Sequence, residues 1–289
     1  MENYDLGRVF SRLFQMVAKG FWPSSGIILI GTLVMGALLY LAFGSVFATL
    51  IDAVGKGSAS QPEMISAVIG AFSGVSIGLT AFALVGILVV GCAVMTGVVD
   101  ACLRIGRGEA ASLSSCFSAG ISKCLPVIGF YIIWYIGSLI VQYATGALFG
   151  LIVPQVALSF LSLIVSLLYY GVFAPSIPAI INETGVGPLS GFPRGLSLIS
   201  GHYGMIVVTL LLAGLIYFIA VIVIVLVMAV LGGVLFAVNK YLLVLLAIPG
   251  LMIIVAISMF GYGSMASIYA ELKLIKEGGD GKSIADVFS

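Results

Sequence analysis

Long apolar runs separated by short polar breaks dominate the chain. Two of these runs, Gly204–Met228 and Tyr241–Met259, contain no charged residue. A bilayer core needs about 20 apolar residues per helix, and backbone groups in lipid must bond within their own segment. Each run therefore predicts a transmembrane helix. The expected spans lie near Ser24–Leu50, Ala71–Val99, Leu125–Leu151, Val156–Ile181, Gly204–Leu235 and Tyr241–Leu272.

A second pattern precedes the first, third and fifth spans, where a short stretch mixes apolar and polar residues at helical spacing. Weaker copies of the first stretch lie at Leu113–Cys124 and Pro188–Ser200. Such stretches are typical of amphipathic helices that lie in the headgroup plane of a membrane. The apolar face of the first copy would contain Leu6, Val9, Phe10, Leu13, Phe14 and Val17.

These patterns predict an all-α integral membrane protein built from three pseudo-repeated units. Each unit would be an interfacial amphipathic helix followed by a helical hairpin. The units would cover about 1–105, 106–186 and 187–289 of a single polytopic membrane domain, 1–289.

Charge is scarce: only 8% of the residues are charged and the net charge is +1. A soluble domain carries about 25% charged residues, and a nucleic-acid-binding domain is strongly basic. The composition thus excludes both classes. The expected partners are membrane lipids, and further copies of the chain or other membrane proteins, with no nucleic acid.

The distribution of Lys and Arg predicts the topology. Ten of the 12 cations precede the first span, lie in even-numbered breaks or follow the last span, whereas Lys56 and Lys240 lie in odd-numbered breaks. Cytoplasmic loops carry the excess of Lys and Arg. We therefore expect both termini on the cytoplasmic side, and we interpret the first apolar run as a retained span, not as a cleaved signal peptide.

Several residues are candidates for packing and lipid contact. Gly70, Gly74 and Gly78 recur every four residues, a spacing that lets membrane helices approach closely. Pro175, Pro178 and Pro249 are predicted to kink or break the fourth and sixth spans, as happens at some transporter sites. The candidates for lipid-headgroup contact are Arg8, Arg12, Lys19 and Arg194.

Catalytic and metal signatures are weak. The residues around Ser76 match the G-x-S-x-G motif of serine hydrolases, but His202, the single histidine, is predicted at the other end of the membrane. No two of the four cysteines have C-x-x-C spacing, and one histidine is too few for a zinc site. We expect no catalytic triad, no metal and no cofactor, and we expect the cysteines to be reduced packing residues.

Three short segments resemble a known family. These are Asp5–Arg12, the pattern Glu183-Thr-Gly185 followed by Arg194, Leu198 and Gly201, and the tail Ile268–Gly278. They are similar to segments of bacterial membrane proteins related to the membrane domain of glycerophosphoryl diester phosphodiesterases. The resemblance implies a bacterial inner membrane. In some relatives this part is fused to a catalytic barrel; because the sequence ends at Ser289 without one, we expect the hydrolase activity not to carry over.

Three functional hypotheses remain open on the sequence. The first is a non-enzymatic membrane protein that organises lipids or partner proteins, including as a homo-oligomer. The second is a transporter or channel for a lipid-like or neutral substrate, which the prolines and the pseudo-repeat would suit. The third is a membrane-embedded lipid-headgroup enzyme. Its site could draw together the polar residues of one membrane face: Asp100, Arg104, Glu183, Arg194 and His202.

Overall fold

A computed structural model describes residues 4–55, 66, 69–70, 75–150, 153–238 and 246–277 of the chain. Helices account for nearly all of these residues, and none of them forms a strand. Six of the helices are long and apolar enough to cross a membrane, which confirms the predicted all-α architecture with six spans. The helices are α1 (Leu6–Gly55), α3 (Ile77–Gly106), α4 (Leu113–Phe149), α5 (Gln155–Asn182), α6 (Pro188–Ile199), α7 (Tyr203–Val238) and α8 (Ala247–Glu277).

The amphipathic stretches differ from the prediction in two of the three units. Only the third forms a helix of its own, α6, whereas the first and second are the opening turns of the long helices α1 and α4. Pro23 and Pro126 lie inside these helices near the predicted junctions. A proline costs a helix one backbone hydrogen bond but does not have to end it, so each stretch continues into its span.

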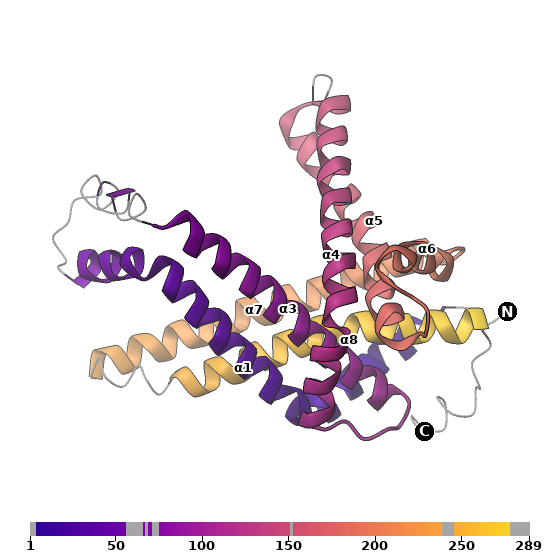
Figure 1. Cartoon of the computed structure of the whole chain (residues 1–289), viewed down its shortest axis with the longest axis horizontal. Coiled ribbons are helices and arrows are strands. Elements are labelled where there is room, and N and C mark those ends of the chain that lie inside the picture. Colours follow the sequence, from indigo (N-terminus) through magenta and orange to yellow (C-terminus); the bar gives the residue numbers. More distant parts are fainter. Residues whose placement is uncertain are drawn as a thin grey trace.

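The spans form three hairpins that meet at one end of the molecule. The hairpins are α1 with α3, α4 with α5, and α7 with α8. Figure 1 shows the α4/α5 hairpin standing apart from the other two, while all three converge near the end of α8. We call this shared end the base, and define it as residues 4–28, 92–130, 172–213 and 255–277. The start of α1 and the end of α8 both lie there, because the Asp5 N–H donates to the Glu271 carboxylate.

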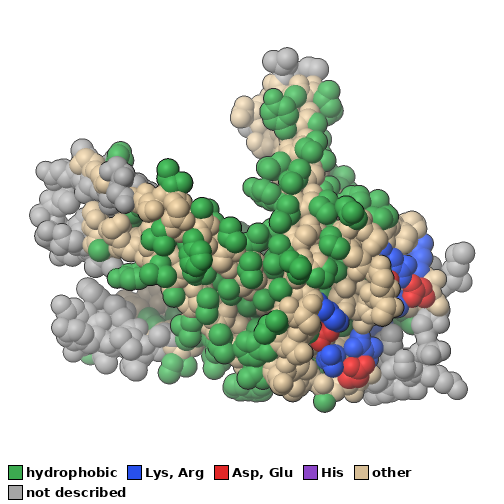
Figure 2. Space-filling model, in the orientation of Figure 1, with side chains coloured by type: hydrophobic (Ala, Val, Ile, Leu, Met, Phe, Trp, Pro, Cys, Tyr) green, Lys and Arg blue, Asp and Glu red, His purple; other side chains and the backbone are tan. Residues whose placement is uncertain are grey.

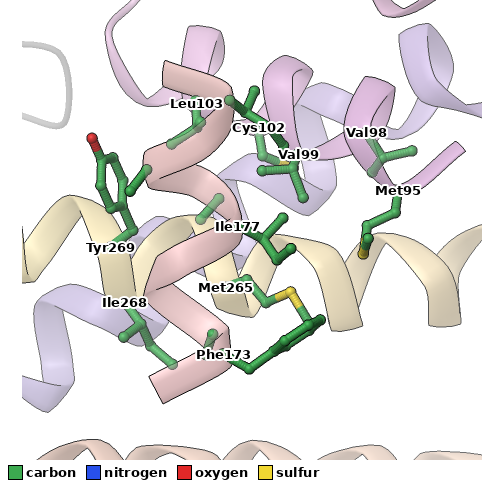
Figure 3. Packing of buried hydrophobic residues seen from close by; sticks show 14 of the residues in the cluster. Met95, Val98, Val99, Cys102, Leu103, Phe173, Ile177, Met265, Ile268 and Tyr269 are labelled. Atoms are coloured by element: carbon green, nitrogen blue, oxygen red, sulfur yellow. The ribbon is translucent and has the colours of Figure 1, made fainter. Parts of the chain in front are cut away.

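The second helices of the hairpins, α3, α5 and α8, form the centre of the base. All three pack against one another. The amphipathic start of α1 also enters this core, where Val9, Leu13 and Met16 are buried. Part of the predicted apolar face therefore packs against protein, whereas Phe14 of the same face is 53% exposed. Figure 3 shows side chains of α3, α5 and α8 pointing toward one another, among them Met95, Val98, Val99, Cys102, Leu103, Phe173, Ile177, Met265, Ile268 and Tyr269.

Away from the base the hairpins bury few side chains. In α7 the buried side chains lie between Ile206 and Ala213, and every side chain described after Ala213 is at least partly exposed. In α4, Thr145 is the only described buried residue beyond Phe130. Apolar side chains cover the hairpins in Figure 2. The fold is thus tight at one end and open at the other.

The close helix contacts do not lie at the predicted glycines. A Cβ added at Gly70 would meet no atom within 4 Å, and one added at Gly78 would meet only Ser76 Oγ, at 3.9 Å. Gly74 lies outside the described residues. Tight positions include Gly97 of α3 and Gly120 of α4, where an added Cβ would lie 2.5 Å and 2.7 Å from a backbone carbonyl oxygen of the other helix. At Gly195 of α6 an added Cβ would lie 2.9 Å from the Val172 carbonyl oxygen of α5. Gly97 and Gly120 lie on different helices and are not four residues apart, so the glycine spacing in the sequence did not identify them.

The prolines do not end the described helices that contain them. Pro175 and Pro178 lie inside α5, which continues through them to Asn182. Pro249 lies in the first turn of α8, where the missing N–H has no helical acceptor to lose. It therefore does not break the sixth span. Residues 241–245, which the prediction placed in that span, lie outside the described residues.

Candidate functional site

The charged residues of the described chain gather at the base. Figure 2 shows this clustering on the visible face, in contrast to the apolar hairpins. Many of these residues form ion pairs that join different helices, while Arg104 and Arg107 pair with acids close to them in the sequence. The base is therefore the candidate site, and its geometry decides what it can do.

Glu271 is the most enclosed of these charges. Its side chain is 0% exposed, and its two oxygens accept hydrogen bonds from Arg8 and Arg12, each at 2.8 Å. Arg12 is itself only 6% exposed. A buried carboxylate is tolerated when it is paired and its oxygens are satisfied, and both conditions hold here. This cluster ties the start of α1 to the end of α8.

Asp100 forms the second cluster, near the end of α3. It accepts a hydrogen bond from Arg104, one helical turn later, at 2.6 Å, which is the expected i,i+4 pair. Lys123 of α4 lies 3.6 Å from its other oxygen and donates to the carbonyl of Ile181, at the end of α5. The lysine therefore joins three helices.

Glu183, which follows the last residue of α5, forms the third cluster. It accepts two hydrogen bonds from Arg194 of α6, at 2.7 and 3.0 Å, and one from the Tyr269 hydroxyl at 2.7 Å. Arg194 also pairs with Glu277, and Lys273 lies 3.9 Å from Glu183. Partial burial alone would raise the pKa of Glu183, but the hydrogen bonds from Arg194 and Tyr269 and the adjacent cations bring it below its ordinary value.

The three clusters share one cyclic plan. In each, an acid at the end of a hairpin's second helix pairs with a base on the amphipathic segment of the next unit. Asp100 of the first unit meets Lys123 of the second, and Glu183 of the second meets Arg194 of the third. Glu271 of the third then closes the ring with the arginines of the first. We call this set of clusters the ion-pair ring.

Polar bridges connect neighbouring clusters of the ring. Arg107, just after α3, donates to the side chain of Asn182 at 2.6 Å. Asn182 in turn donates to the Tyr269 hydroxyl at 3.2 Å, and so reaches α8. These hydrogen bonds, with the one from Tyr269 to Glu183, connect the segment that follows α3 to the Glu183 cluster.

The predicted headgroup contacts fare differently. Arg12 is enclosed and paired with Glu271, so its assignment to lipid headgroups is corrected. Arg8 and Arg194 are partly exposed, and the guanidinium of each forms ion pairs with carboxylates of the ring. Lys19 is exposed and lines a hollow of about 240 Å³ beside Gly108 and Glu109. An arginine side chain faces the protein interior when a carboxylate from a distant segment lies there to pair with it. The spacing of residues along the chain does not reveal such a pair.

The residues proposed for a headgroup enzyme do not form one cluster. Asp100 with Arg104, and Glu183 with Arg194, belong to separate parts of the ring. His202 instead stacks on Tyr4 with ring centroids 6.3 Å apart. Ser76 caps the start of α3, at the end of the helix opposite the base, so it cannot meet His202. The described residues contain no group of three His, Cys, Asp or Glu side chains that could hold a metal ion.

The sequence interpretation missed Glu271 and Lys123 as members of a site. A signal existed: each second span ends near an acid, and each following amphipathic stretch contains a base. Their pairing depends on how the hairpins are placed around the core. The cysteines follow the prediction, since all four are free thiols and Cys92, Cys102 and Cys116 are buried.

Comparison of the chain with known protein families, with curated proteins and with solved structures finds no match. The ion-pair ring is therefore the candidate functional site. Its acids are neutralised by arginine and lysine, so its evident capacity is to hold helices together.

Proposed function

We propose that this chain is a non-enzymatic membrane protein that organises lipids and neighbouring membrane proteins around its hairpins. One observation carries the proposal: the three hairpins are locked together at the base and expose apolar faces beyond it. In α7 none of the side chains described between Gly214 and Val238 is buried. An apolar surface of this length needs lipid or other helices to cover it.

The distribution of charge supports an organising role over transport of charged solutes. Every described Lys and Arg lies at the base, and Asp52 of α1, which follows the candidate span ending at Thr49, is the one described carboxylic acid outside it. The candidate spans beyond the base contain no described acid or base other than tyrosine. Proton relays and ion paths place such residues inside the spans. The base, by contrast, has the paired charges of a structural clamp.

The distribution of Lys and Arg also predicts how the protein is oriented in the membrane. We place the base at the cytoplasmic face of a bacterial inner membrane, because loops on that side carry the excess of Lys and Arg. Both ends of the chain would then be available to cytoplasmic partners, while the exposed hairpins would act within the bilayer.

Cryo-electron microscopy of the protein in native-lipid nanodiscs tests this function. We expect a multimer, or a single copy with ordered lipids against the exposed faces of α4 and α7, and a dry base. Cysteines introduced at Leu226 of α7, and for comparison at the buried Ile206, should report the same contacts by cross-linking. A water-filled path that joins both membrane faces would overturn the proposal in favour of transport.

A further inference from the structure

A cavity of about 320 Å³ lies between α4 and α5, well away from the ion-pair ring. Both helices contribute walls, with Val141 and Gln142 on one side and Leu163 and Ser166 on the other. At 1.5 Å per residue, Gln142 lies about 11 Å from the outer end of α4, and Ser166 about 17 Å from the start of α5. A hydrocarbon core is about 30 Å thick, so the cavity opens into lipid and not into water.

Aromatic side chains form one end of the cavity. Trp134 stacks on Tyr169 with ring centroids 5.5 Å apart, and Tyr170 lies edge-on to the same indole. The Tyr169 hydroxyl donates to the Trp134 carbonyl at 3.1 Å, which fixes the two helices at this level. Gly137 makes room for that hydroxyl, since a Cβ there would collide with it. The cavity thus has a rigid apolar end.

Some polar groups that line this cavity have no partner within the described part of the chain. They include the carboxamide of Gln142, whose side chain is exposed, and the hydroxyl of the half-buried Ser166. The buried Trp134 Nε1 also lacks a partner there. In hydrocarbon, where water cannot compensate, an unpaired amide or hydroxyl is costly. A ligand with oxygen atoms would satisfy these groups.

The lining also defines the charge of the ligand. The residues around the cavity are aromatic, aliphatic, serine and glutamine, and none carries a formal charge. A phosphate or carboxylate would enter unpaired, at a high desolvation cost. Ser138 is not itself unpaired, because its hydroxyl donates to the Tyr135 carbonyl, but it can still accept a bond.

We propose that the cavity between α4 and α5 binds the chain of a neutral lipid whose hydroxyl or carbonyl group hydrogen-bonds to Gln142 and Ser166. The apolar chain packs against Val141, Leu163 and the aromatic end. This site goes beyond the organising role proposed above: it rests on unpaired groups in one hairpin, whereas that role rests on the exposed faces of all three. Either can fail without the other.

Photolabelling of the full-length protein in nanodiscs tests the site. The probe is a long-chain fatty alcohol with a diazirine in its chain, and a fatty acid of equal length serves as its charged counterpart. We expect saturable labelling of residues 134–142 and 163–170 by the alcohol, competed by unlabelled alcohol and weaker with the acid. The double variant Gln142→Leu/Ser166→Ala should lose about tenfold in apparent affinity, as the loss of hydrogen bonds in an apolar site predicts.

A matched double variant, Gln155→Leu/Ser159→Ala, removes the same side-chain types from α5 outside the cavity and should label like the wild type. Because the Gln142/Ser166 variant replaces polar groups by apolar ones in lipid, folding is checked by its gel-filtration profile. The variant Ser138→Phe, which fills the cavity, should abolish saturable labelling by steric means. Even, uncompeted labelling along both helices, or disulfide-linked dimers of Gln142→Cys that exclude the probe, would overturn the proposal.

Discussion

At the scale of single residues, Glu271 shows how the base tolerates charge inside an apolar structure. Two arginines share its carboxylate, and the Asp5 N–H adds a further bond. Removing one partner from a buried cluster is more costly than the cluster's net contribution to stability, because it leaves the other charge uncompensated. The ring is therefore sensitive to any change that unbalances it.

The substitution Glu271→Gln tests this sensitivity. It removes the carboxylate that pairs with the enclosed Arg12 at 2.8 Å, and we expect a loss of about 3–5 kcal/mol in the stability of the base. A thiol-reactive dye measures this loss, since Cys92, Cys102 and Cys116 react only when the base opens. The variant should react at a clearly lower temperature than the wild type.

The control is the same substitution in an exposed ion pair. Glu109 pairs with Arg107 at 2.6 Å, but both side chains are well exposed. Exposed pairs contribute about 0–1 kcal/mol, so Glu109→Gln should leave the dye transition nearly unchanged. Equal shifts for the two variants would contradict the distinction between enclosed and exposed charge.

At the scale of elements, the crossing of α3 and α4 depends on the absence of side chains. Gly97 faces the Cys116 carbonyl and Gly120 faces the Ala93 carbonyl, so the two backbones touch. Neither carbonyl can move without disturbing its own helix. The contact positions the amphipathic start of α4, and with it Lys123, against the end of α3.

The substitution Gly97→Ala should weaken this crossing. Overpacking at a close contact costs about 1–3 kcal/mol, more than the ~1 kcal/mol that alanine gains over glycine in a helix. Thermal unfolding followed by gel filtration would measure the effect. Gly91→Ala in the same helix, where an added Cβ meets no atom within 4 Å, should be neutral or stabilising. A destabilised Gly91 variant and an unaffected Gly97 variant would refute the assigned contact.

The docking of α6 should depend on pH. The pKa of Glu183 is lowered in the folded protein, so its contribution to stability is present above the unfolded pKa of about 4.3 and is lost as pH falls through the folded pKa. A spin label at the exposed Leu189 of α6 should become more mobile as the sample is acidified to about pH 3. In Glu183→Gln the label should be mobile already at neutral pH, with a smaller change on acidification. An acid response that persists in full in Glu183→Gln would point to another group.

At the scale of the whole molecule, each of the three units makes the same kind of contact with the unit before it, and these contacts form a closed cycle. Each amphipathic segment packs on the second helix of the preceding hairpin: α1 on α8, α4 on α3 and α6 on α5. The ion pairs follow the same order. The base is thus closed on itself, and the hairpins extend from it with few contacts among their outer halves.

Cysteine labelling in intact cells tests how this molecule lies in the membrane. In a Cys124→Ser background, whose other thiols are buried, Gln155→Cys lies at the outer end of α5 and Glu109→Cys at the base. An impermeant maleimide should label the first in intact cells and the second only after lysis, if the base is cytoplasmic. The reverse pattern would place the base outside.

The sequence by itself determined the membrane class and the six spans, because an apolar run of sufficient length has no other stable conformation in a bilayer. It also located the amphipathic segments, since a helical period can be read locally. It did not determine that Leu13 and Met16 face protein, or that Gly97 and Gly120 are the tight contacts and not Gly70 and Gly78. Those outcomes depend on which helices become neighbours.

The tertiary structure alone decided the candidate sites. Glu271 meets Arg8 and Arg12 across most of the chain length, and Gln142 and Ser166 line the same cavity from two helices. An isolated charged or amide side chain in an apolar sequence indicates that its burial would cost free energy unless a partner pairs with it. The sequence does not indicate which residue that partner is. Packing of the apolar core brings those partners together, and local sequence patterns carry no record of contacts between segments so far apart.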